Sequence, residues 1–78
     1  MDITARFGKV LRKLRKNAGL TQEQLGFEAD LRRTFVSVLE LGQQQPTLMT
    51  IFKLAKALKM PPSKIIELVE NELDTLSH

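Results

Sequence analysis

The chain has 78 residues, of which 42% are apolar and 27% charged, a composition typical of a folded globular protein rather than a disordered one. It has no cysteine and one histidine, the terminal His78, so disulfides, thiolate metal sites and cysteine nucleophiles are excluded, and we expect no metal, no cofactor and no catalytic residue. No apolar run approaches the ~20 residues of a membrane span and no signal-peptide pattern opens the chain, so we expect a cytoplasmic protein without membrane contact.

The net charge of +3 is unevenly distributed along the chain. Residues 1–16 carry six basic and one acidic side chain, whereas residues 61–78 carry one basic and four acidic side chains. A basic end suits a polyanionic partner. The alternative is a solvated helix face, and charge alone does not decide between the two.

Apolar residues at helical spacing predict two helices in the first part of the chain. The first helix ends at Gly19, because glycine suits the left-handed position that terminates a helix. Thr21 and Gln24 then form a capping box for a second helix over about residues 22–28, which can hardly extend beyond Ala29. The apolar stripe of the first helix consists of Ile3, Phe7, Val10, Leu11 and Leu14.

The third predicted helix begins with an unusual arrangement of charges. In "LRRTFVSVLELG" the helical period resumes from Arg33 to Leu41 and closes on Gly42. Arg32 and Arg33 lie at its N-terminus, where the helix dipole disfavours cations and where hydroxyl or carboxylate caps are preferred. Such a break in a local rule is typical of a functional site. Because about four residues join the second helix to the third, residues 21–41 have the layout of a helix-turn-helix.

Two more helices follow the loop "QQQPT". Thr47 caps a fourth helix, and Pro62 suits the first position of a last helix over about residues 62–74. No segment alternates with period two, so we expect an all-α, compact five-helix fold that forms a single domain over residues 1–78. The apolar positions of the fourth helix are Leu48, Ile51, Phe52, Ala55 and Leu58.

The last predicted helix has an apolar arc wider than one core-facing stripe needs. We expect part of the arc to be buried internally and part to meet a second copy of the chain. The alternative is that Leu73 and Leu76 fray at the terminus. Within the arc, the residues expected at the dimer interface are Ile65, Leu68, Val69 and Leu73.

The stretch "GLTQEQLGFEADLRRTFVSVLELGQQQPTLMTIFKLAKAL" resembles the helix-turn-helix family of phage Cro and C1 repressors, also called the Xre family. Within it, "LRRTFVSVLE" is most similar to the small controller proteins of restriction–modification systems. The resemblance covers about Val10 to Val69. It implies a phage-repressor-like DNA-binding fold in a bacterial or phage-encoded protein that associates with the nucleoid when bound. It also implies that the third helix lies in the DNA major groove with its N-terminal residues on base edges.

The resemblance implies four base-reading residues. Arg33 and Thr34 match the first base-reading positions, and arginine is suited to bidentate bonding to guanine. Ser37 lies one turn further along the same face. Val38 matches a position that reads bases in some repressors, and it offers only apolar contact, for example with a thymine methyl group.

The resemblance also implies residues that bind phosphate. Gln22 matches a phosphate contact at the start of the second helix. Arg32 replaces the usual capping residue, which weakens the cap by ~1 kcal/mol and favours a phosphate contact. Arg15 matches an arginine that pairs with the glutamate ending the third helix, here Glu40, and that lies against the DNA backbone; the alternative is a solvated charge.

The loop after the third helix departs from the family pattern. It carries Gln43 and Gln44 where basic residues are common, and glutamine can bond phosphate but releases no counterions. A monomer should therefore bind weakly, and we expect a homodimer on a two-fold symmetric operator. Leu41 is expected to be buried or to belong to a contact surface.

Several functions remain open to a chain of this kind. We expect a sequence-specific DNA-binding transcription regulator of the restriction–modification controller type. The alternatives are an antitoxin that represses its own operon and a phage-type repressor. A toxin partner or a contact with RNA polymerase stays open. Arg33, Thr34 and the basic first helix argue against an adaptor that does not read DNA. An enzyme is disfavoured because no histidine, cysteine or glycine-rich loop completes a site among the scattered carboxylates.

Overall fold

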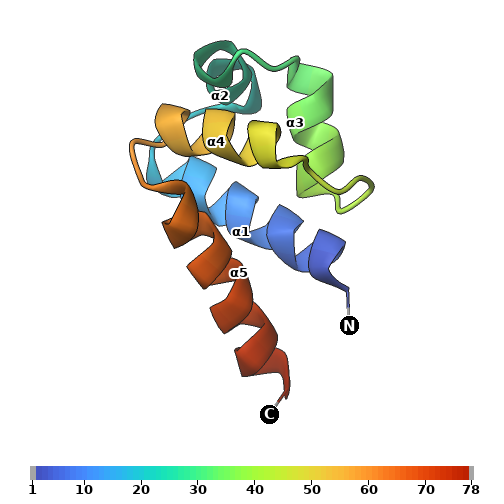
Figure 1. The fold of residues 1–78 in the computed structure, drawn as a ribbon. Coiled ribbons are helices and arrows are strands. Elements are labelled where there is room, and N and C mark those ends of the chain that lie inside the picture. The colour runs from blue at the N-terminus through green and yellow to red at the C-terminus, as the bar shows by residue number, and fades with distance from the viewer. Residues whose placement is uncertain (1, 78) are drawn as a thin grey trace.

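The structure, a computed structural model, describes the backbone of residues 2–77 and the side chains of residues 2–72. Within these residues the chain forms helices and no strand (Figure 1). The predicted all-α five-helix fold is confirmed, and the last helix ends at Ser77 rather than near residue 74. The helices are α1 (Ile3–Asn17), α2 (Gln22–Ala29), α3 (Arg33–Glu40), α4 (Leu48–Ala57) and α5 (Pro62–Ser77).

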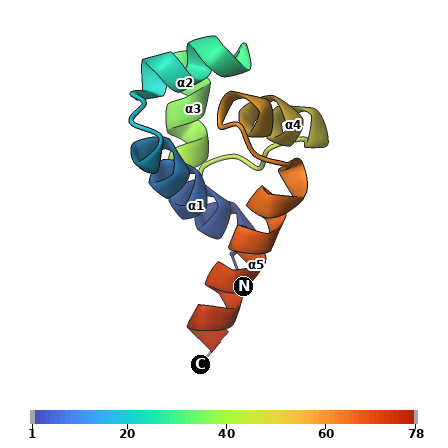
Figure 2. The ribbon, with the colours of Figure 1, turned by 90° about the vertical axis from the view of Figure 1, so that its left-hand side faces the viewer.

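The helices pack around α1 and α4. Helix α1 packs against α3 and α5, α4 packs against α2 and α5, and α2 packs against α3. Figure 1 shows α2 and α3 together at one end of the molecule. Figure 2, turned by 90°, shows α5 projecting from the opposite end. The helix-turn-helix unit is thus remote from the last turns of α5, and the outer sides of α2 and α3 are not covered by the other helices.

Side chains cap the predicted helix starts. Thr21 Oγ1 accepts a hydrogen bond from the Gln24 N–H at 3.0 Å, and Gln24 Oε1 accepts one from the Thr21 N–H at 2.9 Å. This reciprocal pair confirms the predicted capping box of α2. Thr47 Oγ1 accepts from the Thr50 N–H at 3.1 Å, which confirms the predicted cap of α4.

Helices α1 to α4 end in a common backbone arrangement. A residue in the left-handed conformation follows each helix, and two N–H groups bond back to carbonyls of the last turn, as in a Schellman motif. After α1 and α3 this residue is the predicted stop, Gly19 (φ 72°) or Gly42 (φ 71°). After α2 and α4 it is Asp30 (φ 56°) or Lys59 (φ 58°), two positions that carry no glycine signal in the sequence.

One apolar core joins the helices. From α3 it takes Val36 and Leu39, both fully buried, so the inner face of this helix is fixed by packing. The core residues are Phe7, Val10, Leu11, Leu25, Ala29, Val36, Leu39, Ile51, Leu54, Ala55, Leu58, Ile65 and Val69.

A close approach at Gly8 fixes the position of α1 against the C-terminal end of α3. A Cβ atom at Gly8 would lie 2.6 Å from the carbonyl oxygens of both Leu39 and Glu40. No real Cβ contact is that short, so the two helix backbones can approach this closely only over a glycine. This contact brings the Glu40 side chain within reach of α1.

The apolar stripe predicted for α4 divides between core and surface. Ile51, Ala55 and Leu58 are buried as expected, but Leu48 and Phe52 are exposed. The reason is that α4 is apolar over more of its circumference than α2 and α5 can cover. Among the described residues, no helix combines the length and the apolar character needed to cross a bilayer.

Candidate nucleic-acid interface

Helix α3 has two distinct faces. Val36 and Leu39 point into the core, whereas Arg33 and Thr34 are exposed at the N-terminal end. Ser37 and Val38 are half-buried, as expected for positions beside the exposed stripe. The four side chains for which base reading is predicted therefore lie on or beside the uncovered face of one helix. Their contact with bases stays a prediction.

The N-terminus of α3 has no side-chain cap. Arg32 occupies the N-cap position with extended backbone (φ −70°, ψ 143°) and makes no capping hydrogen bond, as the sequence predicts. Because Arg32 and Arg33 are both exposed here, this helix end presents two guanidinium groups beside uncapped N–H groups. An anion would satisfy both kinds of donor.

Three helices meet at the ion pair of Arg15 with Glu40. The Arg15 Nε atom donates to Glu40 Oε2 at 2.6 Å and its Nη2 atom donates to Oε1 at 3.0 Å, so the pair is bidentate. The Arg15 Nη1 atom donates to the Leu20 carbonyl at 2.9 Å, and Gln22 Nε2 donates to Glu40 Oε1 at 3.1 Å. The predicted pair is therefore present, and Gln22 also bonds to it.

Burial and hydrogen bonding restrict the Arg15 guanidinium group and the Glu40 carboxylate to this arrangement. The exposed fractions of the two side chains are 11% for Arg15 and 4% for Glu40. Hydrogen bonding to Glu40 raises the pKa of Arg15 above its ordinary value, although burial acts in the opposite direction. The guanidinium group thus remains charged and oriented.

A hollow of about 560 Å³ lies between the start of α2 and the start of α3. The N-terminus of α2, with its partial positive charge, faces a space that is also bordered by two arginines, which is favourable for an anion. Glu23 at the rim is the opposing charge. The lining residues are Arg15, Thr21, Gln22, Glu23, Gln24 and Arg33. The structure thus brings together three of the residues implicated from sequence: Arg15, Gln22 and Arg33.

The loop after α3 is at the surface. Gln43 and Gln44, for which phosphate contacts are predicted, are exposed. Leu41 is 67% exposed, which rules out its burial in this chain and leaves the second expectation, a contact surface.

The predicted dimer interface needs correction. Ile65 has no exposed surface and Val69 is buried, because the first half of α5 packs against α1 and α4. These two residues hold the monomer together and are not available to a partner. Leu68 is half-buried, and the side chain of Leu73 lies outside the described residues.

A different apolar surface is exposed on α4 and α5, and sequence reasoning did not find it. We define the α4–α5 surface as Leu48, Met49, Phe52 and Ile66, whose side chains are half or more exposed. A hollow of about 440 Å³ adjoins this surface at Phe52, and its other lining residues are Lys53, Lys56, Met60 and Pro62. The signal in the sequence that could have indicated this surface is that α4 carries apolar residues on more than one face.

Comparisons with known proteins identify the class. A family model described as helix-turn-helix (HTH_3) matches residues 11–65, and the chain belongs to this helix-turn-helix family. Among the described residues, no group of three or more His, Cys, Asp or Glu side chains is placed to hold a metal ion.

The similar proteins include several restriction–modification controllers. The control protein C.BamHI of Bacillus amyloliquefaciens is 36% identical over 67 residues, which cover 85% of this chain and 83% of the relative. The crystal structure of the restriction–modification controller protein C.AhdI of Aeromonas hydrophila is 42% identical, with a TM-score of 0.77 over 80% of this chain and 94% of that one. The controller C.Esp1396I, a tetramer in complex with its natural 35 base-pair operator, is 25% identical with a TM-score of 0.83 over 92% and 95% of the two chains. The predicted resemblance is confirmed.

Proposed function

We propose that this chain is a sequence-specific DNA-binding transcription regulator of the restriction–modification controller type. It binds a two-fold symmetric operator as a homodimer, and residues 1–78 act as one domain in the cytoplasm. The observation that carries the proposal is the uncovered face of α3, with Arg33 and Thr34 exposed beside the hollow at the start of α2.

Base reading is assigned to the uncovered face of α3. A helix of this width fits the major groove, where arginine bonds bidentately to guanine O6 and N7 and where hydroxyl groups bond to several bases. Arg33 and Thr34 are the first side chains to enter, with Ser37 and Val38 one turn later. The negative phosphates on both sides of the groove offset the unfavourable position of Arg33 at a helix N-terminus.

Phosphate binding is assigned to the hollow between α2 and α3. Gln22 and the first N–H groups of α2 face it, and Arg15 is held at its border by Glu40. Because the guanidinium group is already ordered, little side-chain entropy is lost when a phosphate arrives. Arg32, Gln43 and Gln44 extend this contact on the exposed side of α3 and in the following loop.

Dimerisation is assigned to the α4–α5 surface. Several large apolar side chains exposed on two neighbouring helices are typical of an interaction site. The occupant is a second copy, because an operator read twice requires two α3 helices in fixed relation. The operator-bound controller that resembles this chain is itself an oligomer, which supports this assignment. Lys53 and Lys56 at the edge of the hollow suit a polar rim around the apolar centre.

The antitoxin and phage-repressor alternatives would use the same DNA-reading geometry. The named relatives, which are control proteins of restriction–modification systems, favour the controller. A regulator of this class acts by binding and not by catalysis, in line with the scattered carboxylates.

The salt dependence of operator binding tests this function. Each phosphate neutralised by the protein releases counterions, so a dimer making six to ten contacts should lose about 10³–10⁵ in affinity between roughly 50 and 200 mM salt. Fluorescence anisotropy with a palindromic duplex from a randomised-site selection measures this loss. An unrelated duplex of equal length serves as the control and should bind more weakly at every salt concentration. A flat salt profile on the selected duplex would overturn the proposed function.

A further inference from the structure

Helix α1 carries four cations on its solvent face, away from the core. Lys9, Arg12, Lys13 and Lys16 are all exposed, and they line a hollow of about 420 Å³ together with Val10, Asn17 and Glu72. Within residues 2–72, none of the ion pairs found involves any of the four. The base-reading and phosphate-binding assignments above do not use this basic face.

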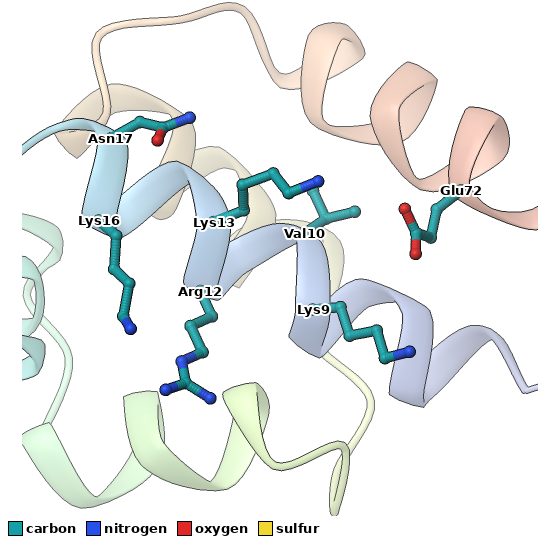
Figure 3. A pocket seen from close by; sticks show the side chains of 7 residues that line it. All are labelled: Lys9, Val10, Arg12, Lys13, Lys16, Asn17 and Glu72. Atoms are coloured by element: carbon teal, nitrogen blue, oxygen red, sulfur yellow. The ribbon is translucent and has the colours of Figure 1, made fainter.

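Figure 3 separates the four cations into two pairs. Arg12 and Lys16 extend toward the side of α3. The tips of Lys9 and Lys13 extend instead toward the part of α5 that carries the carboxylate of Glu72. The second pair therefore has an acidic group of its own chain nearby, whereas the first pair faces the helix-turn-helix unit.

The first pair continues the basic surface of the candidate interface. Lys16 directly follows Arg15, which borders the hollow between α2 and α3 together with Arg33. Arg12 lies one helical turn before Lys16 on the same face of α1. Arg12 and Lys16 are therefore neighbours of Arg15, which Glu40 holds in place. They extend the basic surface along α1.

We propose that Arg12 and Lys16 are positioning residues that contact the DNA phosphate backbone without reading any base. The proposal rests on the proposed function and names duplex DNA as the occupant, because this pair is continuous with the face that meets DNA. Their role is to raise affinity for operator and non-operator DNA alike through counterion release. Contacts of this kind fix the orientation of a reading helix and carry no sequence information.

The matched variants are Arg12→Gln with Lys16→Gln, and Lys9→Gln with Lys13→Gln. Both double variants remove two charges per chain from exposed positions of one helix, so both should fold as the wild type does by circular dichroism. Removing one phosphate contact lowers the magnitude of the slope of log affinity against log salt by about 0.9. For a dimer the first variant should therefore lower it by about 3 to 4 on both operator and unrelated duplexes. The second variant should lower the magnitude of the slope by less than the amount that corresponds to one phosphate contact per chain, which is about 1.8 for a dimer.

The outcomes separate the two proposals. If the wild type shows no salt-dependent operator binding, the proposed function itself fails. If the wild type binds steeply but the Arg12→Gln/Lys16→Gln protein keeps the wild-type slope, this face does not contact DNA and serves another partner, such as an acidic protein. An equal decrease in slope for both double variants would indicate a general effect of net charge and would also overturn the assignment. A changed base preference in a randomised-site selection would make the pair base readers, again contrary to the proposal.

Discussion

Arg32 and Arg33 are neighbours of the same residue type with different expected roles. Arg33 is the first residue of α3 and Arg32 is its N-cap, and both are exposed. Neither side chain supports the core, so replacing either should leave the fold intact. Their comparison therefore isolates base reading from phosphate binding.

We expect Arg33→Ala to weaken binding at the preferred operator by about 1–3 kcal/mol and to relax the preference at one base pair in each half-site. Arg32→Ala should weaken binding to all sequences alike, because a phosphate contact carries no base information. A randomised-site selection with each variant measures the difference. An unchanged preference for Arg33→Ala would show that the assigned register of α3 is wrong.

Removing only one partner of the Arg15–Glu40 pair should be strongly destabilising, because both side chains are largely buried and the other charge is left without its partner. Arg15→Met should cost on the order of 3–5 kcal/mol, since it leaves the Glu40 carboxylate buried with Gln22 as its remaining side-chain partner. Urea unfolding measures this destabilisation. The double variant Arg15→Met with Glu40→Leu should recover much of the stability, because no charge is then left unpaired. Additive effects in the two single variants and the double variant would contradict this account.

At the scale of helices, the turn between α2 and α3 depends on one strained residue. Asp30 adopts the left-handed conformation (φ 56°), which costs most residues other than glycine roughly 1 kcal/mol, and somewhat less for aspartate. Its side chain is 97% exposed and its contact with Lys53, at 3.8 Å, is long, so removing the carboxylate should change stability little.

We therefore expect Asp30→Gly to raise the thermal midpoint and Asp30→Ala to lower it. The two substitutions remove the same carboxylate and differ only in whether a Cβ atom is present at a left-handed position. Differential scanning calorimetry compares them directly. A lower midpoint for the glycine variant would mean that the Asp30 side chain contributes more than its conformation costs.

These helix ends also show what the sequence could and could not predict. The helix ends at Gly19 and Gly42 and the Thr21–Gln24 capping box could be predicted, because glycine favours the left-handed conformation and threonine and glutamine side chains cap a nearby helix start. The left-handed conformations of Asp30 and Lys59 could not be predicted from their residue types, since they depend on how the following helix packs. Likewise the Arg15 pair followed from a resemblance, because residues far apart in sequence have no local signal. Periodicity located α5 but did not distinguish its core side from a free side, which is why Ile65 and Val69 were misassigned.

For the whole molecule, the decisive question is which surface joins two copies. Two α3 helices must lie about 34–36 Å apart to enter successive major grooves on one side of a duplex. A rigid interface can set that spacing. The α4–α5 surface is the candidate, because α4 packs directly on α2 and so connects the interface to the reading unit.

We expect Phe52→Asp to convert the dimer to a monomer and to weaken operator binding without removing a DNA contact. The matched control is Phe27→Asp on α2, because Phe27 is also exposed, at 87% against 59% for Phe52. Sedimentation velocity at micromolar concentration should give a monomer for the first variant and a dimer for the second. A dimer in both cases would place the interface elsewhere, with Leu41 and the following loop as the next surface to test.

Because the two faces of α3 have separate roles, the preferred operator sequence can change without any change in how the helix packs. Val36, Leu39, Glu40 and the close approach at Gly8 secure the helix from behind, while Arg33 and Thr34 carry no share of that attachment. Exchanging these outward residues should therefore leave the melting behaviour nearly constant while the preferred operator changes. Two controllers that differ in these outward residues could therefore act in one cell without binding each other's operators, although their folds remain equivalent.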